Sequence, residues 1–237
     1  MKPVQIFVGS LAPLPGSGRL TGMFKHPAEG PLEIGPEGFT ADQQADRRVH
    51  GGPEKAVHLY PAEHYVRLAG SFPEAAARLV PGSLGENLST RGLTEADVCI
   101  GDVFRLGTAR LQVCQPRSPC WKIDTRFGVD GMAALIAETG MTGWYWRVLE
   151  PGRAQAGDAL VLAERAPEGI ALAAAMAIWR AHRPALADLE RVAAAPGIAA
   201  GWRRKILDRA EWLRQQPDQP PDQPPPAPPA FHRKPAD

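Results

Sequence analysis

Up to about residue 165, short runs of β-branched and aromatic residues are separated by glycine and proline, which is typical of β-strands. Two helices are expected between these runs, at about 61–69 and 130–139. Because no regular helical insertion follows each strand, the pattern predicts a mainly β fold with added helices, a barrel or a sandwich rather than a parallel sheet. The expected strands lie at 4–9, 56–60, 98–107, 109–115, 144–150 and 158–164, with a hairpin turn at Gly107 and Thr108.

After Pro167 the chain becomes rich in alanine, and its apolar residues recur at helical spacings. Three helices are expected, at 168–182, 184–195 and 199–215. Helices this short bury little core of their own, so we expect them to pack on the β-rich part or on another subunit. The basic residues of the last helix form a solvated face or steer an acidic partner. The apolar face of this last helix is formed by Trp202, Ile206, Ala210 and Leu213.

Residues 217–237 read PDQPPDQPPPAPPAFHRKPAD and carry few apolar side chains that could offset the entropy of ordering. We expect a disordered tail of polyproline II character there, either inert or docked on an aromatic-lined groove. The predicted domains are therefore a β-rich domain at 1–165, a three-helix domain at 168–216 and the tail at 217–237.

The charges nearly balance, with 27 Lys and Arg against 26 Asp and Glu, so the chain has no strong overall positive field. This excludes the simplest class of nucleic-acid or membrane-surface protein. The longest apolar run, 169–179, is shorter than the roughly 18 residues of a membrane span, and the N-terminus is not a secretory signal. Three cysteines cannot form a closed disulfide framework, which favours a reducing compartment, the cytoplasm.

The segment 112–122 reads QVCQPRSPCWK and is the strongest candidate for chemistry. Two prolines stiffen it, and Arg117 and Lys122 flank Cys120. Nearby cations favour a thiolate, so Cys120 is the candidate reactive thiol or soft-metal ligand. Cys114 and Cys99 lie in apolar runs and are expected to be small buried residues.

A Cys–His pair would need a nearby imidazole, and the sequence leaves open whether His50, His58 or His64 supplies it. A zinc site is not expected, because the chain has no CxxC or HxxxH-type pair. The residues His50, Gly51 and Gly52 offer backbone amides that could point at an anion, or they form a plain hairpin loop.

Two further features complete the set of candidates. Lys55 follows the two glycines and could meet an anion. The segment Gly85–Leu88, GENL, offers the carboxylate of Glu86 and the amide of Asn87, and by itself indicates a loop with local hydrogen bonds.

Taken together and in this order, these motifs resemble the MOSC domain, which is named for the C-terminal part of molybdenum cofactor sulfurases. The chain is most similar to the stand-alone bacterial YiiM-type branch, which is linked to resistance against hydroxylaminopurine. The resemblance covers about residues 1–165, and the helices at 168–216 match a small extension of that branch. The motifs are Asp42–Gln43, VHGGPEKAVHLY at 49–60, GENL at 85–88 with Gly92, IGDVFRLG at 100–107 and LQVCQPRSPCWK at 111–122.

The resemblance implies a β-barrel whose pocket holds the molybdenum cofactor, a pterin dithiolene with a phosphate. By motif position, Cys120 is the protein ligand of the metal, and thiolate ligation suits molybdenum. Arg117 and Lys122 are expected to contact the cofactor. Lys55 and the amides of Gly51 and Gly52 supply further anion contacts, while His50 and Asn87 face the pocket.

The resemblance also implies a molybdenum-dependent oxidoreductase that reduces N-hydroxylated compounds, such as hydroxylaminopurine-type bases, to amines. The chain carries no flavin or nicotinamide fingerprint, so a separate reductase is expected to donate the electrons. The alternative is a non-catalytic carrier of cofactor or sulfur that uses a Cys120 persulfide. Pyridoxal phosphate is associated with the sulfurases through another domain and is not expected to bind here. We expect a homodimer, and neither nucleic acid nor a membrane as partner.

Overall fold

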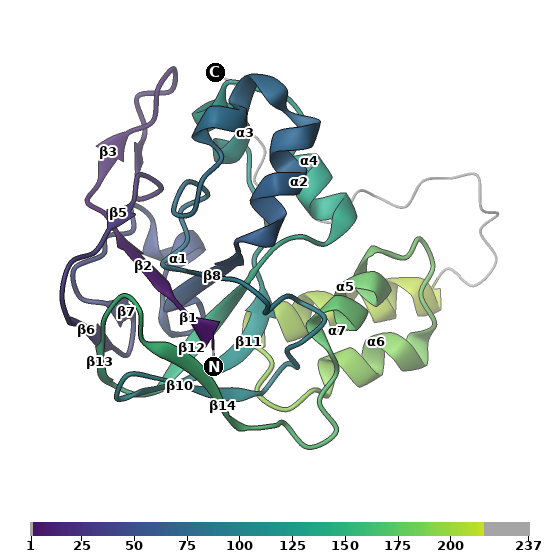
Figure 1. Cartoon of the computed structure of the whole chain (residues 1–237). Helices are drawn as coiled ribbons and strands as arrows, with labels where there is room; N and C mark the ends of the chain where they lie inside the picture. The colour runs from purple at the N-terminus through teal and green to yellow at the C-terminus, as the bar shows by residue number, and fades with distance from the viewer. Residues whose placement is uncertain (1, 216–237) are drawn as a thin grey trace.

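A curled mixed sheet of nine strands forms the centre of the protein (Figure 1). The computed structural model describes residues 2–215, except the side chains of Arg48 and Val49. Neighbouring strands are antiparallel except β8 and β9, which are parallel. In order across the sheet, the strands are β1 (Lys2–Pro3), β14 (Ala159–Glu164), β10 (Val103–Leu106), β11 (Ala109–Pro116), β12 (Trp144–Glu150), β8 (Val57–Pro61), β9 (Leu88–Thr90), β2 (Gln5–Val8) and β5 (His26–Pro27).

Shorter elements surround this sheet. A three-stranded sheet has the order β13 (Gly152–Ala154), β6 (Leu32–Gly35) and β7 (Gly38–Phe39), and β3 (Ala12–Pro13) pairs with β4 (Leu20–Thr21). Two 3-10 helices lie at Pro53–Lys55 and Pro73–Arg78. The α-helices are α1 (Arg47–His50), α2 (Glu63–Ser71), α3 (Lys122–Phe127), α4 (Met132–Thr139), α5 (Leu172–Arg180), α6 (Leu186–Ala193) and α7 (Ala200–Gln215).

The closed barrel that we predicted is not observed among the described residues, because the sheet has β1 at one edge and β5 at the other. β1 and β2 are successive parts of one stretch of chain, and only Val4 separates them. Val4 belongs to neither the β1–β14 nor the β2–β9 ladder. Its N–H donates to the Asp158 carbonyl at 3.1 Å, and its carbonyl accepts from the Gly157 N–H at 2.8 Å. The stretch thus contacts both β14 and β9 without a continuous ladder. The fold is a sheet-dominated one with several helices.

The long elements follow the sequence pattern. The predicted strands are present as β2, β8, β10, β11, β12 and β14, and the predicted helices as α2, α4, α5, α6 and α7, with ends that differ by a few residues. The largest difference is in the run 98–107, where only Val103–Leu106 is a strand. Cys99 instead forms an isolated bridge with Ala171. The tail predicted at 217–237 lies outside the described residues.

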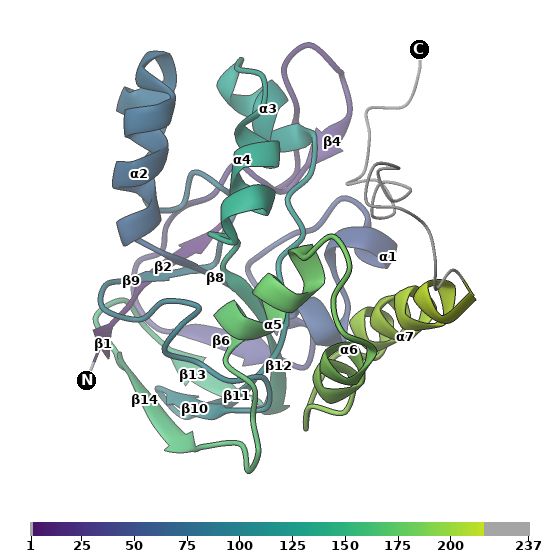
Figure 2. The same ribbon diagram turned by 90° about the vertical axis from the view of Figure 1, so that its right-hand side faces the viewer.

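Two groups of helices pack on different sides of the sheet, as both views show (Figures 1 and 2). α5, α6 and α7 share one hydrophobic core with the sheet, in which Trp202 and Ile206 join Leu111 and Val113. α2, α3 and α4 form a second core around Tyr60 of β8, together with Met23 and Leu84. Of the two alternatives for the C-terminal helices, packing on the β-rich part is the one observed. Within residues 2–215, no helix is both long and apolar enough to cross a membrane.

Candidate functional site

Three neighbouring strands place a row of polar side chains at one end of the central sheet. In the register of β8, β12 and β11, His58 is opposite Tyr145, and Tyr145 is opposite Gln115. The rings of His58 and Tyr145 have centroids 5.1 Å apart. Because paired residues of adjacent strands project on the same face, these three side chains form a continuous row.

A register shift in β11 is needed for this row. The pairing with β12 shifts between Val113 and Gln115, so that Cys114 is the additional residue. Val113 and Cys114 are both buried in the core, whereas Gln115 pairs with Tyr145 in the register and its Nε2 donates to the Glu54 carbonyl at 2.8 Å. Such bulges redirect side chains next to functional sites in many sheets.

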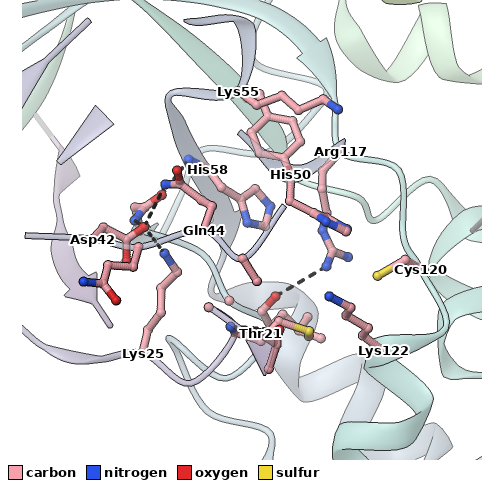
Figure 3. Close-up of a pocket in the computed structure, with 18 residues that line it drawn as sticks. Thr21, Lys25, Asp42, Gln44, His50, Lys55, His58, Arg117, Cys120 and Lys122 are labelled. Atoms are coloured by element: carbon pink, nitrogen blue, oxygen red, sulfur yellow. Dashed lines mark hydrogen bonds and ion pairs between the residues drawn. The ribbon is translucent and has the colours of Figure 1, made fainter. Parts of the chain in front are cut away.

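The loop after β11 brings the candidate thiol to the same place. Arg117 is held by its backbone, whose N–H donates to the Gly143 carbonyl at 3.1 Å. Cys120 lies just before α3, and its carbonyl accepts from the Ile123 N–H at 3.0 Å. The side chains of Arg117, Cys120 and Lys122 line one pocket, and Figure 3 shows the two cationic groups beside the sulfur. The local prediction that two cations accompany this thiol is therefore matched by the geometry.

This pocket, hereafter the Cys120 pocket, receives residues from distant parts of the chain. His50 comes from the end of α1 and Lys55 from the 3-10 helix that follows it. Gly52, which caps that 3-10 helix, has φ +87°, a conformation that residues with a side chain rarely adopt. The predicted site residues that line the Cys120 pocket are His50, Lys55, Asn87, Arg117, Cys120 and Lys122.

Gly51 and Gly52 are placed differently from our expectation. They line an adjoining chamber rather than the Cys120 pocket itself. Asn87 lines the pocket, but the protein already uses its amide: Nδ2 donates to the Phe7 carbonyl at 3.3 Å and to Asp42 at 3.0 Å, and Oδ1 accepts from the His58 N–H at 3.1 Å. Asn87 thus joins the pocket wall to β8.

A buried ion pair closes the side of the pocket nearest the N-terminal segment. Lys25 donates to Asp42 at 2.5 Å, and both side chains are almost fully buried. Burial lowers the pKa of Lys25, and the Asp42 carboxylate opposes that shift. Because Lys25 is neutralised by Asp42, the uncompensated positive charge of the pocket lies near Cys120.

Two buried nitrogens in the pocket have no hydrogen-bond partner among the described residues, His58 Nε2 and Arg117 Nη1. The other Arg117 nitrogen, Nη2, makes a long contact of 3.5 Å with the Leu84 carbonyl. Burial lowers the pKa of His58 well below its usual 6.5, and the charges of Arg117 and Lys25 lower it further. Buried polar atoms normally have partners, so an unpaired cation and an unpaired neutral imidazole indicate space for a ligand with acceptor or anionic groups.

The chemistry of these side chains fits a molybdenum cofactor. One thiol lines the pocket as a soft ligand, and Arg117 and Lys122, neither paired with a carboxylate in the described part of the chain, can meet an anionic group. Cys120 itself is only 3% exposed. A metal bound there would be shielded from bulk water.

The other candidates lie elsewhere. Cys114 is fully buried in the core, as expected, and burial raises the pKa of its thiol to about 12. Cys99 is less buried than expected and accepts a contact from Arg165 at 3.4 Å. His64 does not line the Cys120 pocket, because it pairs with Glu95 at 2.8 Å. Of the histidines left open, His50 and His58 are therefore the ones near the thiol.

Glu86 of the GENL segment has a structural role. Its carboxylate is fully buried and accepts hydrogen bonds from the N–H groups of Gly82 and Leu84, at 2.6 and 3.1 Å, and from the Tyr65 hydroxyl. This network shapes the loop that leads to Asn87. The local hydrogen bonding expected for the segment is observed.

Sequence analysis missed Lys25 and Tyr145 as residues of the pocket, and it named His58 only as one of three histidines that could lie near the thiol. His58 and Tyr145 lie in the predicted strands at 56–60 and 144–150. A polar residue between apolar neighbours in each run was the available signal. Lys25 carried none, because the chain around it has no regular period.

Comparisons with known proteins place the chain in a family. The MOSC domain matches residues 46–161. Protein YiiM of Escherichia coli (strain K12) is 39% identical over 208 residues, which are 87% of this chain and 92% of that protein. Its crystal structure matches with a TM-score of 0.75 and 32% identity over 92% of this chain and 95% of that one.

The crystal structure of YiiM from Geobacillus stearothermophilus matches with a TM-score of 0.73 and 33% identity, over 88% of this chain and 100% of that one. A protein of Gibberella moniliformis (strain M3125 / FGSC 7600) named "Reductase" is 36% identical over 144 residues, 60% of this chain and 26% of that protein. The resemblance that we inferred from the sequence motifs is confirmed: the chain belongs to the MOSC domain family and to its YiiM-like members.

Proposed function

We propose that this protein binds a molybdenum cofactor in the Cys120 pocket and reduces N-hydroxylated compounds, of the hydroxylaminopurine type, to amines. The observation that carries the proposal is the meeting of one thiol with two unpaired buried nitrogens, His58 Nε2 and Arg117 Nη1. A ligand that is both anionic and rich in acceptors would satisfy both nitrogens. A pterin dithiolene that carries a phosphate is such a ligand.

The protein's residues have distinct roles in this proposal. Cys120 ligates the metal, and the prolines on either side of Ser118 fix the direction of its loop. Arg117 and Lys122 hold the anionic part of the cofactor. The low pKa of His58 keeps its imidazole neutral, so that it hydrogen-bonds to the pterin without adding charge.

The bound cofactor supplies the two electrons of the overall reaction, R–NHOH + 2e⁻ + 2H⁺ → R–NH₂ + H₂O. His50 lies where the Cys120 pocket meets the adjoining chamber, and we assign to it the delivery of a proton to the departing hydroxyl. A separate reductase delivers the electrons. The name "Reductase" of the Gibberella relative supports a redox role for this domain.

The alternative is a carrier that holds sulfur as a persulfide on Cys120. A carrier thiol must be reached by the partner that receives the sulfur. Cys120 is 3% exposed and faces the inside of a pocket, which favours a bound cofactor over transfer to another protein. The reductase is therefore the better supported function.

The test compares the metal content of the purified protein with that of two cysteine variants. We expect about one molybdenum per chain in wild type and in Cys99→Ser, and none in Cys120→Ser, by elemental analysis. Cys99 is a matched control because it lies outside the pocket. Equal molybdenum in all three proteins would contradict the assignment of the ligand.

Activity is then measured on the loaded protein with an artificial electron donor and 6-hydroxylaminopurine. We expect conversion to adenine by wild type and none by Cys120→Ser. Loaded protein that shows no turnover, yet restores a cofactor-free molybdenum enzyme, would replace the reductase by the carrier.

A further inference from the structure

A second chamber adjoins the Cys120 pocket at the start of α7. His50, Lys55 and Tyr145 line both spaces, so the two spaces meet at these three residues. The row of paired strand residues continues from one to the other, since His58 lines the first and Gln115 the second. We name this space the α7 chamber, and its far side is formed by Trp202 and Lys205.

The start of α7 is fixed against the sheet beside this chamber. The Ala199 N–H donates to the carbonyl of Cys114, the additional residue of β11, at 2.9 Å. The Ala200 N–H donates to the Glu54 carboxylate at 2.9 Å, and Arg147 pairs with the same carboxylate at 2.8 Å. These bonds hold the first turn of α7 in place, so Trp202 and Lys205 are set at a defined distance from the strands.

The chamber combines flat apolar groups with positive charge. Tyr145, Trp202 and Pro116 provide the apolar surface. Lys55 and Lys205 provide the charge, and the Lys205 ammonium is close enough to help lower the pKa of Lys55, after burial as the main cause. Glu54 lies nearby, but Arg147 and the Ala200 N–H already bind its carboxylate. No carboxylate pairs with Lys205 within the described residues.

The cationic side chains thus form two groups, one in each of the two adjoining spaces. Arg117 and Lys122 lie beside Cys120, and Lys205 lies in the α7 chamber with Lys55 at the junction. Like charges held together in a partly closed space favour an anion between them. The first group accounts for the phosphate of the cofactor, and Lys205, which pairs with no carboxylate of the described residues, can meet another anion.

We propose that the α7 chamber binds the phosphate of a purine nucleotide, so that N-hydroxylated nucleotides are preferred to free bases. This inference rests on the proposed function for the position of the reacting N–OH group near Cys120. The base lies against Tyr145, where the two spaces meet, and the phosphate lies between Lys55 and Lys205. The C-terminal helices thereby determine which substrates the MOSC domain accepts.

The experiment measures binding of adenosine monophosphate and adenosine to the purified, metal-loaded full chain by titration calorimetry. Neither ligand carries an N–OH group, so binding is measured without turnover. We expect wild type to bind the nucleotide about tenfold more tightly than the nucleoside, as for one charge-assisted phosphate contact. Lys205→Ala should bind both ligands equally. Arg204→Ala should keep the preference, because Arg204 is an exposed neighbour that lines a different surface.

Each other outcome overturns the inference. Equal affinity of wild type for the two ligands excludes a phosphate site, and equal losses in Lys205→Ala and Arg204→Ala indicate nonspecific attraction. Loss of molybdenum in Lys205→Ala assigns this cation to the phosphate of the cofactor instead. A protein that prefers the nucleotide in this way but never reduces hydroxylaminopurine contradicts the proposed function and leaves the nucleotide site in place.

Discussion

Cys114 and Cys120 lie close together in sequence, and both are almost fully buried, but their surroundings are opposite. Cys114 belongs to the core, and its S–H donates to the carbonyls of Glu54 and Tyr145 at 3.1 and 3.4 Å. Burial raises its pKa to about 12. Cys120 lines a pocket with Arg117 and Lys122, two cations without a carboxylate partner among the described residues.

The comparison shows that burial alone does not decide what a thiol does. In the core, the S–H of Cys114 has carbonyl acceptors, and its sulfur does not line the Cys120 pocket. The pocket around Cys120 leaves Arg117 Nη1 and His58 Nε2 unsatisfied. An unsatisfied buried cation is costly in the absence of a ligand, which is the expected signature of a site built for an anion rather than for stability.

The largest expected effect is a difference in thiol reactivity. A thiol with a pKa of about 12 has roughly a thousandth of the thiolate that an ordinary cysteine has at pH 8, so Cys114 should react with iodoacetamide about a thousandfold more slowly in the folded than in the unfolded protein. Cys120 of metal-free protein, which lines a pocket, should be labelled before Cys114. Mass spectrometry of the labelled peptides over time checks both rates.

The cofactor provides the control for this experiment. Loading with molybdenum should protect Cys120 and leave the rate at Cys114 unchanged. Equal labelling of the two thiols in folded, metal-free protein would show that their surroundings do not differ as described.

The fold could largely be predicted from the sequence because its long elements carry clear periods. β12 spans Trp144–Glu150, the predicted run, and α7 buries Trp202 and Ile206, the predicted face. The barrel could not be judged from local patterns, since closure depends on how Val4 bonds to residues near the other end of the domain. Very short strands such as β13 have no period to detect.

The candidate site was predictable only where its residues are close in sequence. Arg117, Cys120 and Lys122 share one loop, so their proximity followed from the spacing. His58 and Tyr145 depend on the register between β8 and β12, and no single run of sequence specifies which residues are paired across a sheet.

A substitution in the core should show what the interior contributes to stability. Leu111 on β11 is fully buried and packs in the same core as Cys114. Leu111→Ala removes apolar contacts and leaves a cavity, so the free energy of unfolding should fall by about 3 kcal/mol. Denaturant titration measures the change. A loss below about 1 kcal/mol would mean that the core relaxes around the cavity.

A substitution in the pocket should raise the free energy of unfolding instead of lowering it. Arg117→Leu replaces a buried cation, whose Nη1 has no partner and whose Nη2 makes only a long contact with the Leu84 carbonyl, by an apolar side chain, so metal-free protein should gain about 1 to 2 kcal/mol in the free energy of unfolding. The same variant should lose molybdenum. Lys122→Leu is the control for stability, because Lys122 is less buried and should gain less. Destabilisation by Arg117→Leu would indicate that the guanidinium contributes to the fold instead.

The smallest effect concerns pH, and it follows from the pKa of His58. Burial holds that pKa well below 6.5 in the folded protein, whereas the unfolded chain takes up a proton near 6.5. The unfolded state therefore binds more protons as the pH falls from about 6.5 to 5, and the free energy of unfolding should decrease by up to ~1.4 kcal/mol per pH unit from this group. His58→Gln should flatten that decrease, and substitution of the exposed His26 by Gln should leave it as in wild type. Denaturant titrations at pH 5 and 6.5 measure this change in the free energy of unfolding. If wild type and His58→Gln lose the same free energy of unfolding between the two pH values, His58 is protonated in the folded pocket and adds to its positive charge. The contrast between a neutral imidazole and a cationic thiol site then no longer holds.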